Sequence, residues 1–254
     1  MVKLKIGVKS VMGPRKTMED QYVFSEDFLG KGSFFAAVFD GHGGSLASEI
    51  AKRELPKEVK KRLKIKLPQE LIEEALSASF RSISSGIREK TDVGTTATIL
   101  LVLEDDVYLA HVGDSSALIL AKNGEWAFLT RNHNLTELSE VKNLVEKGAL
   151  VKSGYLWGRS GSGVNLSRAL GDRDFAEWLL DEPDVSHFKL KDEFSHIVLA
   201  TDGLWNSLDG QKVAAVLKKN RIAQKSAGLL SEMALSEMKK QGWGDNVTVL
   251  VITF

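Results

Sequence analysis

The chain contains no cysteine. This absence excludes disulfide bonds, thiolate ligands for zinc and any mechanism built on a cysteine nucleophile. A hydrolytic reaction would therefore need an activated serine, a histidine or a metal-bound water as its nucleophile.

An excess of either charge is also absent, because 34 Lys and Arg residues balance 34 Asp and Glu residues. A nucleic-acid-binding domain normally carries a basic excess, so we expect no nucleic-acid partner. No apolar run approaches the roughly 18 residues of a membrane-spanning helix, so we expect no membrane association. The first seven residues alternate like a strand and do not resemble a signal peptide, which makes the cytoplasm the default location.

Length and composition predict one folded domain. The 254 residues lie near the upper end of a single all-β or α/β domain, and 43% of them are hydrophobic, which supports a sizeable core. No linker, internal repeat or low-complexity tract interrupts the chain. We therefore expect a single domain over residues 1–254, acting as a monomer.

Alternating and apolar stretches predict more strands than helices. Strands are expected over residues 2–11, 20–25, 33–40, 95–103, 107–112, 117–121, 126–129, 196–201 and 247–254. Helices are expected from residue 45 to a break near Pro56, and over 69–88, 137–147, 210–219 and 223–240. Most strands follow one another as hairpins, one of them with a tight turn at Asn123-Gly124. This order favours an α+β domain with antiparallel sheets over a parallel βαβ arrangement.

A glycine- and serine-rich stretch covers residues 158–163. Its spacing does not match a Walker loop, which requires Gly-x-x-x-x-Gly-Lys. We interpret the stretch as a flexible connection near the functional site.

Three aspartates stand at the ends of apolar strands. Asp40 follows the run 33–39 and precedes several glycines. Asp202 ends the run 196–201, whereas Asp245 comes just before the last strand. If that last strand runs antiparallel to the other two, all three carboxylates meet at one rim. Crowded carboxylates repel one another, and proton uptake or a divalent cation relieves the repulsion.

The ligand types indicate which cation would bind. Oxygen-only ligands favour hard ions such as Mg²⁺ or Mn²⁺, and no EF-hand spacing supports a dedicated calcium site. Glu19 and Asp20 add acid near another strand, and Asp114 follows the strand that ends at Val112. The alternative is that each aspartate simply caps a turn, which fits one aspartate better than it fits three.

Seven short motifs follow one another over nearly the whole chain. They are Ser10-x-x-Gly13-x-Arg15-x-x-Met18-Glu19-Asp20, Phe39-Asp40-Gly41-His42-Gly43-Gly44, Gly94-Thr95-Thr96-Ala97, Val112-Gly113-Asp114-Ser115, Leu166-Ser167-Arg168-Ala169-Leu170-Gly171-Asp172, Ala200-Thr201-Asp202-Gly203-Leu204-Trp205 and Asp245-Asn246-Val247-Thr248. In this order they resemble the metal-dependent type 2C serine/threonine protein phosphatases. One such motif is weak evidence, whereas seven in order are strong.

The resemblance implies a four-layer α-β-β-α sandwich, in which helices flank two antiparallel sheets. It also implies a centre of two Mg²⁺ or Mn²⁺ ions at one end. Asp40 would bridge both ions, and Asp202 and Asp245 would complete one of them. The Gly41 carbonyl and a water held by Glu19 would serve the other ion.

Three further residues receive roles from the same resemblance. Asp20 would support the metal ligands. Arg15 would grip the substrate phosphate, because its planar guanidinium suits a phosphoryl group. His42 would protonate the leaving oxygen, because imidazole titrates near neutrality. Without the motif order, a solvated loop charge and a turn residue would be the preferred interpretations of Arg15 and His42.

The chain departs from the family pattern in three places. Family members often carry Asp-His-Lys-Pro where this chain has the segment 132–135, and an arginine where it has Ser116. Asn206 stands where an acid often helps to hold a third, weaker ion. Asp114 is still available as a ligand, and a third ion, if one binds, should be held less tightly. The two-ion core is unaffected.

The resemblance implies hydrolysis of phosphoserine and phosphothreonine in phosphorylated protein substrates. Metal-activated water would attack directly, without a covalent intermediate. Two alternatives stay open. A catalytically silent docking module would show loss of metal aspartates, and none of the core ones is missing. A phosphatase of small phosphorylated molecules is equally compatible with the fold and metals, because these do not fix substrate size.

Overall fold

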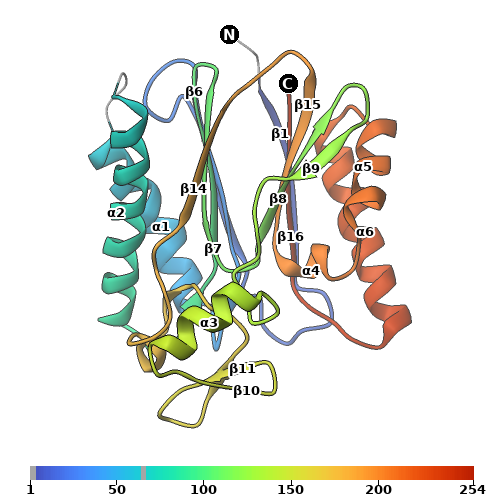
Figure 1. Cartoon of the computed structure of the whole chain (residues 1–254). Coiled ribbons are helices and arrows are strands. Elements are labelled where there is room, and N and C mark those ends of the chain that lie inside the picture. Colours follow the sequence, from blue (N-terminus) through green and yellow to red (C-terminus); the bar gives the residue numbers. More distant parts are fainter. Residues whose placement is uncertain (1–3, 64–66) are drawn as a thin grey trace.

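Two five-stranded sheets face each other in the computed structural model, which describes residues 4–63 and 67–254 (Figure 1). One sheet has the order β1 (Lys5–Val11), β16 (Val247–Thr253), β15 (Phe194–Ala200), β8 (Ser116–Ala121) and β9 (Trp126–Phe128). The other has the order β14 (Asp184–Lys189), β7 (Asp106–Val112), β6 (Ala97–Leu103), β3 (Ser33–Phe39) and β2 (Gln21–Glu26). Neighbouring strands are antiparallel throughout both sheets, as predicted.

Helices cover the outer face of each sheet. The pair α1 (Leu46–Arg62) and α2 (Gln69–Arg88) lies against the sheet that contains β3, and the pair α5 (Gly210–Lys219) and α6 (Ala223–Gln241) lies against the other (Figure 1). The expected four-layer α-β-β-α sandwich is therefore confirmed. Within the described ranges, no helix combines the length and apolar character needed to cross a membrane.

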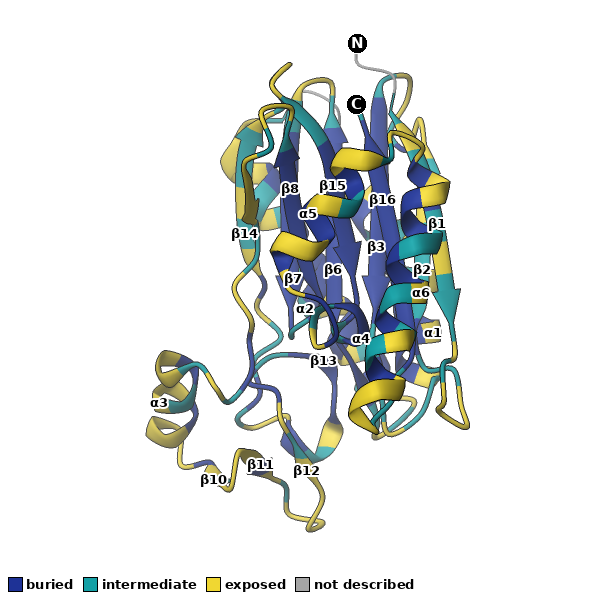
Figure 2. Cartoon of the chain, turned by 90° about the vertical axis from the view of Figure 1, so that its right-hand side faces the viewer, coloured by how far each residue is buried: buried dark blue, intermediate teal, exposed yellow. Residues whose placement is uncertain are grey.

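Smaller elements gather at one end of the sandwich. A short sheet joins β4 (Gly41–His42), β5 (Gly94–Thr95) and β13 (Leu170–Gly171), while α4 (Asp202–Trp205) and the 3₁₀ turn η1 (Arg173–Phe175) flank it. A lobe made of α3 (Leu138–Glu146), β10 (Leu150–Lys152), β11 (Tyr155–Trp157) and β12 (Gly163–Val164) projects beyond this end (Figures 1 and 2).

Strand β3 shows why the sequence reads as an unbroken apolar run. All seven of its residues are buried. Because side chains alternate across a strand, Phe35 and Phe39 face α1 and α2, whereas Phe34 and Val38 face the second sheet. Since both faces are covered, no polar alternation remains in this strand, and Figure 2 shows the inner strands as the most buried part of the molecule.

One expectation about the elements is wrong, and several strands were not expected. No break occurs near Pro56, because α1 runs through it from Leu46 to Arg62. The proline loses one backbone hydrogen bond, but Leu55 and Val59 on either side are fully buried and hold the helix in place. The sequence also gave no indication of β14 or of the short strands in the lobe. Residues 2 and 3 of the first predicted strand lie outside the described residues.

Candidate metal centre

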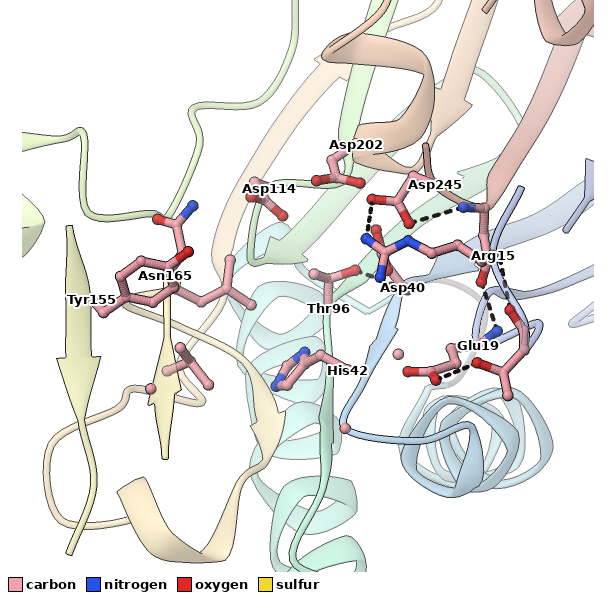
Figure 3. Close-up of a pocket in the computed structure, with 17 residues that line it drawn as sticks. Arg15, Glu19, Asp40, His42, Thr96, Asp114, Tyr155, Asn165, Asp202 and Asp245 are labelled. Atoms are coloured by element: carbon pink, nitrogen blue, oxygen red, sulfur yellow. Dashed lines mark hydrogen bonds and ion pairs between the residues drawn. The ribbon is translucent and has the colours of Figure 1, made fainter. Parts of the chain in front are cut away.

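Asp40, Asp202 and Asp245 line a single cavity of about 370 Å³ (Figure 3). Asp40 follows β3 in one sheet, and Asp202 opens α4 just after β15 in the other. Asp245 precedes β16, which runs antiparallel to β15 and pairs Val249 with Ala200. The end of one strand therefore lies beside the start of the other, and the expected convergence of the three carboxylates occurs.

Five of the other six predicted site residues line the same cavity: Arg15, Glu19, Gly41, His42 and Asp114. Asp20 is the exception, since it does not line the cavity and its side chain is buried behind it. One oxygen of Asp20 accepts a hydrogen bond from Thr201 Oγ1 at 2.9 Å. Its other oxygen has no hydrogen-bond partner among the described residues. This position suits a supporting role better than direct ligation.

The crowded carboxylates hold their protons more tightly than usual. Burial, together with the neighbouring charges of Asp20 and Asp202, raises the pKa of Asp40 well above its ordinary value. Burial and the charge of Asp202 raise the pKa of Asp114 to about 7. Burial also raises the pKa of Asp20 to about 7, although hydrogen bonds from two threonines oppose the shift. The ionised carboxylates therefore need more positive charge than the residues around the cavity supply.

A divalent cation would supply this positive charge, so the residues fit the expected metals. The donors facing the cavity are carboxylate oxygens, which suit Mg²⁺ and Mn²⁺. The unpaired buried oxygen of Asp20 lies behind the cavity and is not one of these donors. Arg15 is the only arginine or lysine that lines the cavity within the described part of the chain.

Arg15 is anchored beside the carboxylates and not free in solvent. Its Nη2 donates to Asp245 Oδ2 at 2.9 Å, and its Nε donates to the Gly244 carbonyl at 2.9 Å. The side chain nevertheless stays 56% exposed. The guanidinium can therefore meet an anion that enters the cavity without leaving its anchors.

His42 is paired with Asp172, a residue to which the sequence analysis assigned no role. Its Nε2 lies 2.8 and 2.9 Å from the two carboxylate oxygens of Asp172. Burial lowers the pKa of His42, but the charge and hydrogen bond of Asp172 outweigh it and raise that pKa overall. The imidazole therefore keeps a proton more readily at neutral pH. Asp172 stood in the fifth quoted motif, so its signal was present but its use was not evident.

Glycine at position 94 makes room for this pair. A Cβ on Gly94 would lie only 2.0 Å from Asp172 Oδ2, which no side chain tolerates. Asp172 itself has φ of 55°, a left-handed conformation that aspartate adopts more readily than most residues. The strand pairing of β5 with β13 therefore places the carboxylate directly beside His42.

Asn246 is a second organiser that the sequence analysis missed. Its side-chain amide donates to the carbonyls of Met12 and Thr17, and its Oδ1 accepts from the backbone N–H of Glu19 at 2.7 Å. Glu19 in turn accepts from the Gly44 N–H at 3.1 Å. Asn246 thus joins the end of the chain to the N-terminal loop, where only the three-dimensional fold brings them together.

Asn206 stands where many family members have an acid that helps to hold a third ion. Asn206 Nδ2 donates to Asp202 Oδ2 at 3.0 Å, so it partly neutralises that carboxylate instead of adding a charge. Asp114 lines the cavity beside Asp202 (Figure 3). This arrangement is consistent with the expectation that a third ion would bind weakly.

The projecting lobe closes one wall of the cavity through Tyr155 and residues 163–166. The glycine- and serine-rich stretch therefore does lie at the site, because its last residue, Gly163, is part of that wall. Any molecule that enters the cavity meets both the carboxylates and this lobe.

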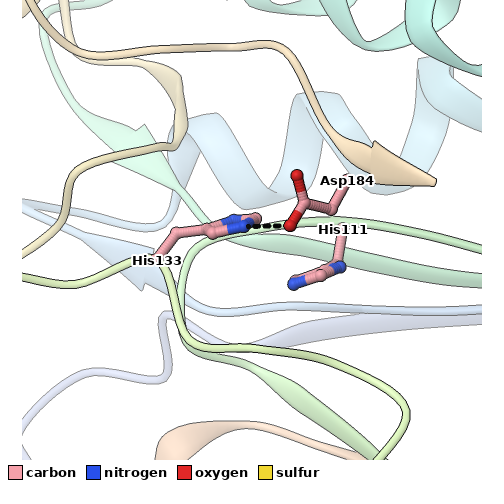
Figure 4. A group of neighbouring side chains, drawn as sticks. All are labelled: His111, His133 and Asp184. Atoms are coloured by element: carbon pink, nitrogen blue, oxygen red, sulfur yellow. Dashed lines mark hydrogen bonds and ion pairs between the residues drawn. The ribbon is translucent and has the colours of Figure 1, made fainter. Parts of the chain in front are cut away.

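A second group, His111, His133 and Asp184, has ligand atoms within 4.8 Å of one another (Figure 4). The two imidazole rings are stacked, with centroids 4.4 Å apart and planes only 8° from parallel. A metal bound to an imidazole lies in the ring plane, so two stacked parallel rings cannot share one ion without rotating. His133 Nε2 instead hydrogen-bonds Asp184 at 3.0 Å. We interpret the group as a structural contact between the edge strand β14 and the segment before the lobe.

Comparison with known proteins gives consistent results. The sequence model described as Protein phosphatase 2C matches residues 4–247. The chain is 30% identical over 257 residues to probable protein phosphatase 2C 52 of Oryza sativa subsp. japonica, covering 99% of this chain and 50% of that protein. It is 30% identical to probable protein phosphatase 2C member 13, mitochondrial, of the same plant, covering 99% and 69%. The chain thus spans roughly half to two thirds of the length of these relatives.

Solved structures show the same fold. Serine-threonine phosphatase 2C from Toxoplasma gondii superposes with a TM-score of 0.84 at 21% identity, covering 99% of this chain and 95% of that one. A C. elegans sex determining protein superposes with a TM-score of 0.86 at 22% identity, covering 100% and 65%. At these identities the structures support the architecture alone.

Proposed function

The chain belongs to the protein phosphatase 2C family, and from this we propose that it hydrolyses phosphoserine and phosphothreonine in proteins with the help of divalent metal ions. Metal dependence is general in this family. The observation that carries the proposal is the convergence of Asp40, Asp202 and Asp245 on one cavity from both sheets. When bound, two Mg²⁺ or Mn²⁺ ions would supply the positive charge that makes water a nucleophile near neutral pH.

The same residues would hold the ions. We assign Asp40 to both ions, Asp202 and Asp245 to one, and the Gly41 carbonyl and Glu19 to the other. Asp20, which is buried behind the cavity, would orient these ligands through Thr201. Asp114 would contribute to a weaker third ion.

Arg15 and His42 would act on the substrate. The exposed guanidinium of Arg15 would bind the phosphoryl oxygens, while its hydrogen bond to Asp245 keeps it oriented. His42 would carry the proton that the leaving serine or threonine oxygen needs, since Asp172 favours its protonated form. The lobe would contact the peptide around the phosphorylated residue, because Tyr155 and Asn165 line the entrance.

The test is turnover of a phosphothreonine peptide with Mn²⁺ and with chelator. We expect activity that disappears on chelation and returns with Mn²⁺. Asp202→Asn should lower turnover by at least about 100-fold, because it removes a metal ligand. Asp192→Asn changes an exposed aspartate outside the cavity and serves as the matched control. Activity that survives chelation, or an Asp202→Asn variant as active as the control, would refute the proposal.

Substrate class needs its own comparison. Phosphopeptides, p-nitrophenyl phosphate and small phosphorylated metabolites should be assayed side by side at equal concentration. We expect the highest kcat/KM for phosphopeptides, because the open cavity continues onto the lobe. A preference for small metabolites would keep the metal centre but overturn the protein substrate.

A further inference from the structure

A second cavity of about 840 Å³ lies at the opposite end of the molecule from the aspartates. Its lining comes from the start of β1, the turn between β8 and β9, the start of β15 and the end of α5. Along β1, Lys5 pairs with Thr253 at this end and Val11 pairs with Val247 at the aspartate end. A seven-residue strand is roughly 20 Å long, so the two cavities are separate.

Four cationic side chains line this cavity: Lys5, Lys122, Lys218 and Arg221. None of the lining side chains within the described ranges is acidic, although the whole chain has equal numbers of acidic and basic residues. The four cations also form no ion pair with any described residue, whereas many other surface lysines and arginines do. None of these four cations is therefore held by a carboxylate side chain of the described residues.

The neighbouring acids are engaged elsewhere. Glu125, in the same turn, accepts a hydrogen bond from Asn123 Nδ2 at 2.8 Å. Glu193 pairs with Lys191 at 3.6 Å. Neither lines the cavity.

A buried histidine also lines this cavity. His196 is only 5% exposed, and its Nε2 is fully enclosed by the protein. Burial lowers the pKa of His196, although the backbone of Asn220 opposes the shift. The imidazole therefore adds no positive charge to the cavity.

Helix electrostatics explains only part of this cluster. Lys218 lies in the last turn of α5 and Arg221 follows it, so both are favourable beside the helix C-terminus. Lys5 and Lys122 come from a strand and a hairpin turn, where no helix end attracts them. Four cations without ion-pair partners in the described part of the chain, all around one cavity, therefore indicate an anionic ligand.

We propose that this cavity binds a small anion that carries a diphosphate group. Two linked phosphoryl groups bring several negative charges and match four cations better than a single phosphate does. The volume lies within the range of small-molecule sites, and Leu120 and Leu217 give it an apolar floor.

The test uses the full chain labelled with ¹⁵N-histidine and titrated with sodium pyrophosphate. A chelator is present because pyrophosphate itself binds divalent ions. The chain has only five histidines, so His196 reports on this cavity and His42 reports on the aspartate cavity. We expect saturable changes in the His196 signals, because His196 lines the cavity.

The triple variant K122Q/K218Q/R221Q should weaken pyrophosphate binding by at least about tenfold, because three charged contacts are lost. The matched control K31Q/K239Q removes exposed lysines outside the cavity and should bind like the parent chain. All three changed side chains are exposed, so folding should persist, and the other four histidine signals verify it.

Several outcomes overturn the proposal. These are changes confined to His42, His196 changes that persist equally in the triple variant, and inorganic phosphate binding as tightly as pyrophosphate. An ADP titration then separates the two sources of the diphosphate group. Tighter binding of ADP than of pyrophosphate supports an organic diphosphate, and failure of ADP to bind supports the inorganic anion.

Discussion

The pairing of His42 with Asp172 is the contact on which the proposed proton transfer depends most directly. Asp172 raises the pKa of His42 through its charge and hydrogen bond, against the effect of burial. Asp172→Asn should therefore lower that pKa. The proton donor would then be lost at a lower pH, so the alkaline limb of the kcat profile should move to lower pH. We expect kcat at pH 8 to fall by about tenfold.

The control for Asp172→Asn is Asp105→Asn, at an exposed position away from both cavities. Measurement of kcat from pH 6 to 9 on a phosphopeptide distinguishes the two variants. An unchanged pH profile with a uniformly lower kcat would mean that Asp172 acts only on local structure.

A second residue-scale prediction concerns His111, which is 3% exposed and stacks on His133. Burial and the neighbouring His133 lower its pKa to about 4. The folded state thus keeps His111 neutral between its folded pKa and its ordinary value of 6.5, whereas the unfolded chain takes up a proton. Stability from this group is complete above about pH 6.5 and is lost as the pH falls toward 4.

The expected loss is about 1–2 kcal/mol of unfolding free energy between pH 7.5 and pH 5. Urea unfolding at both pH values, for the parent chain and for His111→Gln, measures it. The variant should be less stable overall but should show a smaller pH dependence. An equal pH dependence in both proteins would assign the effect to other groups.

At the scale of the elements, β3 determines the stability of the sandwich because it is buried on both faces. Phe35→Ala empties a fully buried position beneath α1 and α2 and should reduce the unfolding free energy by about 3–5 kcal/mol. Phe24, in the adjacent strand β2, is 41% exposed, so Phe24→Ala should cost much less. Denaturant midpoints at constant m-value test the pair. Equal losses would show that β3 is not the central element.

Pro56 shows that tertiary packing can keep a helix continuous where the local sequence predicts a break. A proline inside a helix costs about 3 kcal/mol, and the sequence therefore predicted a break. Burial of Leu55 and Val59 provides a comparable stabilisation, and the helix continues. The edge strand β14 is the reverse case, since its mixed pattern of polar and apolar residues becomes a strand only by pairing with β7.

At the scale of the whole molecule, the proposed metal centre would connect the two halves of the sandwich. Asp40 follows a strand of one sheet, and Asp202 and Asp245 lie beside strand ends of the other. Ions that bind all three should stabilise the folded state, by about 2.7 kcal/mol at a free Mn²⁺ concentration 100 times the Kd. Thermal unfolding with and without Mn²⁺ should therefore show a concentration-dependent rise in Tm.

Asp40→Asn should abolish this rise, because the carboxylate proposed to hold both ions is lost. Asp192→Asn, which changes an exposed aspartate, should keep it. A Tm that does not respond to Mn²⁺ in the parent chain would contradict a metal site between the sheets.

The sequence by itself determined the layered α+β class, the long strands and helices, and the residues that gather at the cavity. These features are local or carried by motif order: apolar runs fix buried strands, and an aspartate that ends such a run must lie at the edge of a sheet. The charge balance and the lack of cysteine were equally plain from the chain alone.

The tertiary structure decided which partners these residues have. Asp172 with His42, Asn246 with the N-terminal loop and the basic cavity around His196 join segments that are far apart in the chain. Sequence spacing carries no record of such distances, because they depend on how sheets and helices pack. For the same reason, the helix through Pro56 and the edge strand β14 emerged only once their burial and pairing were known.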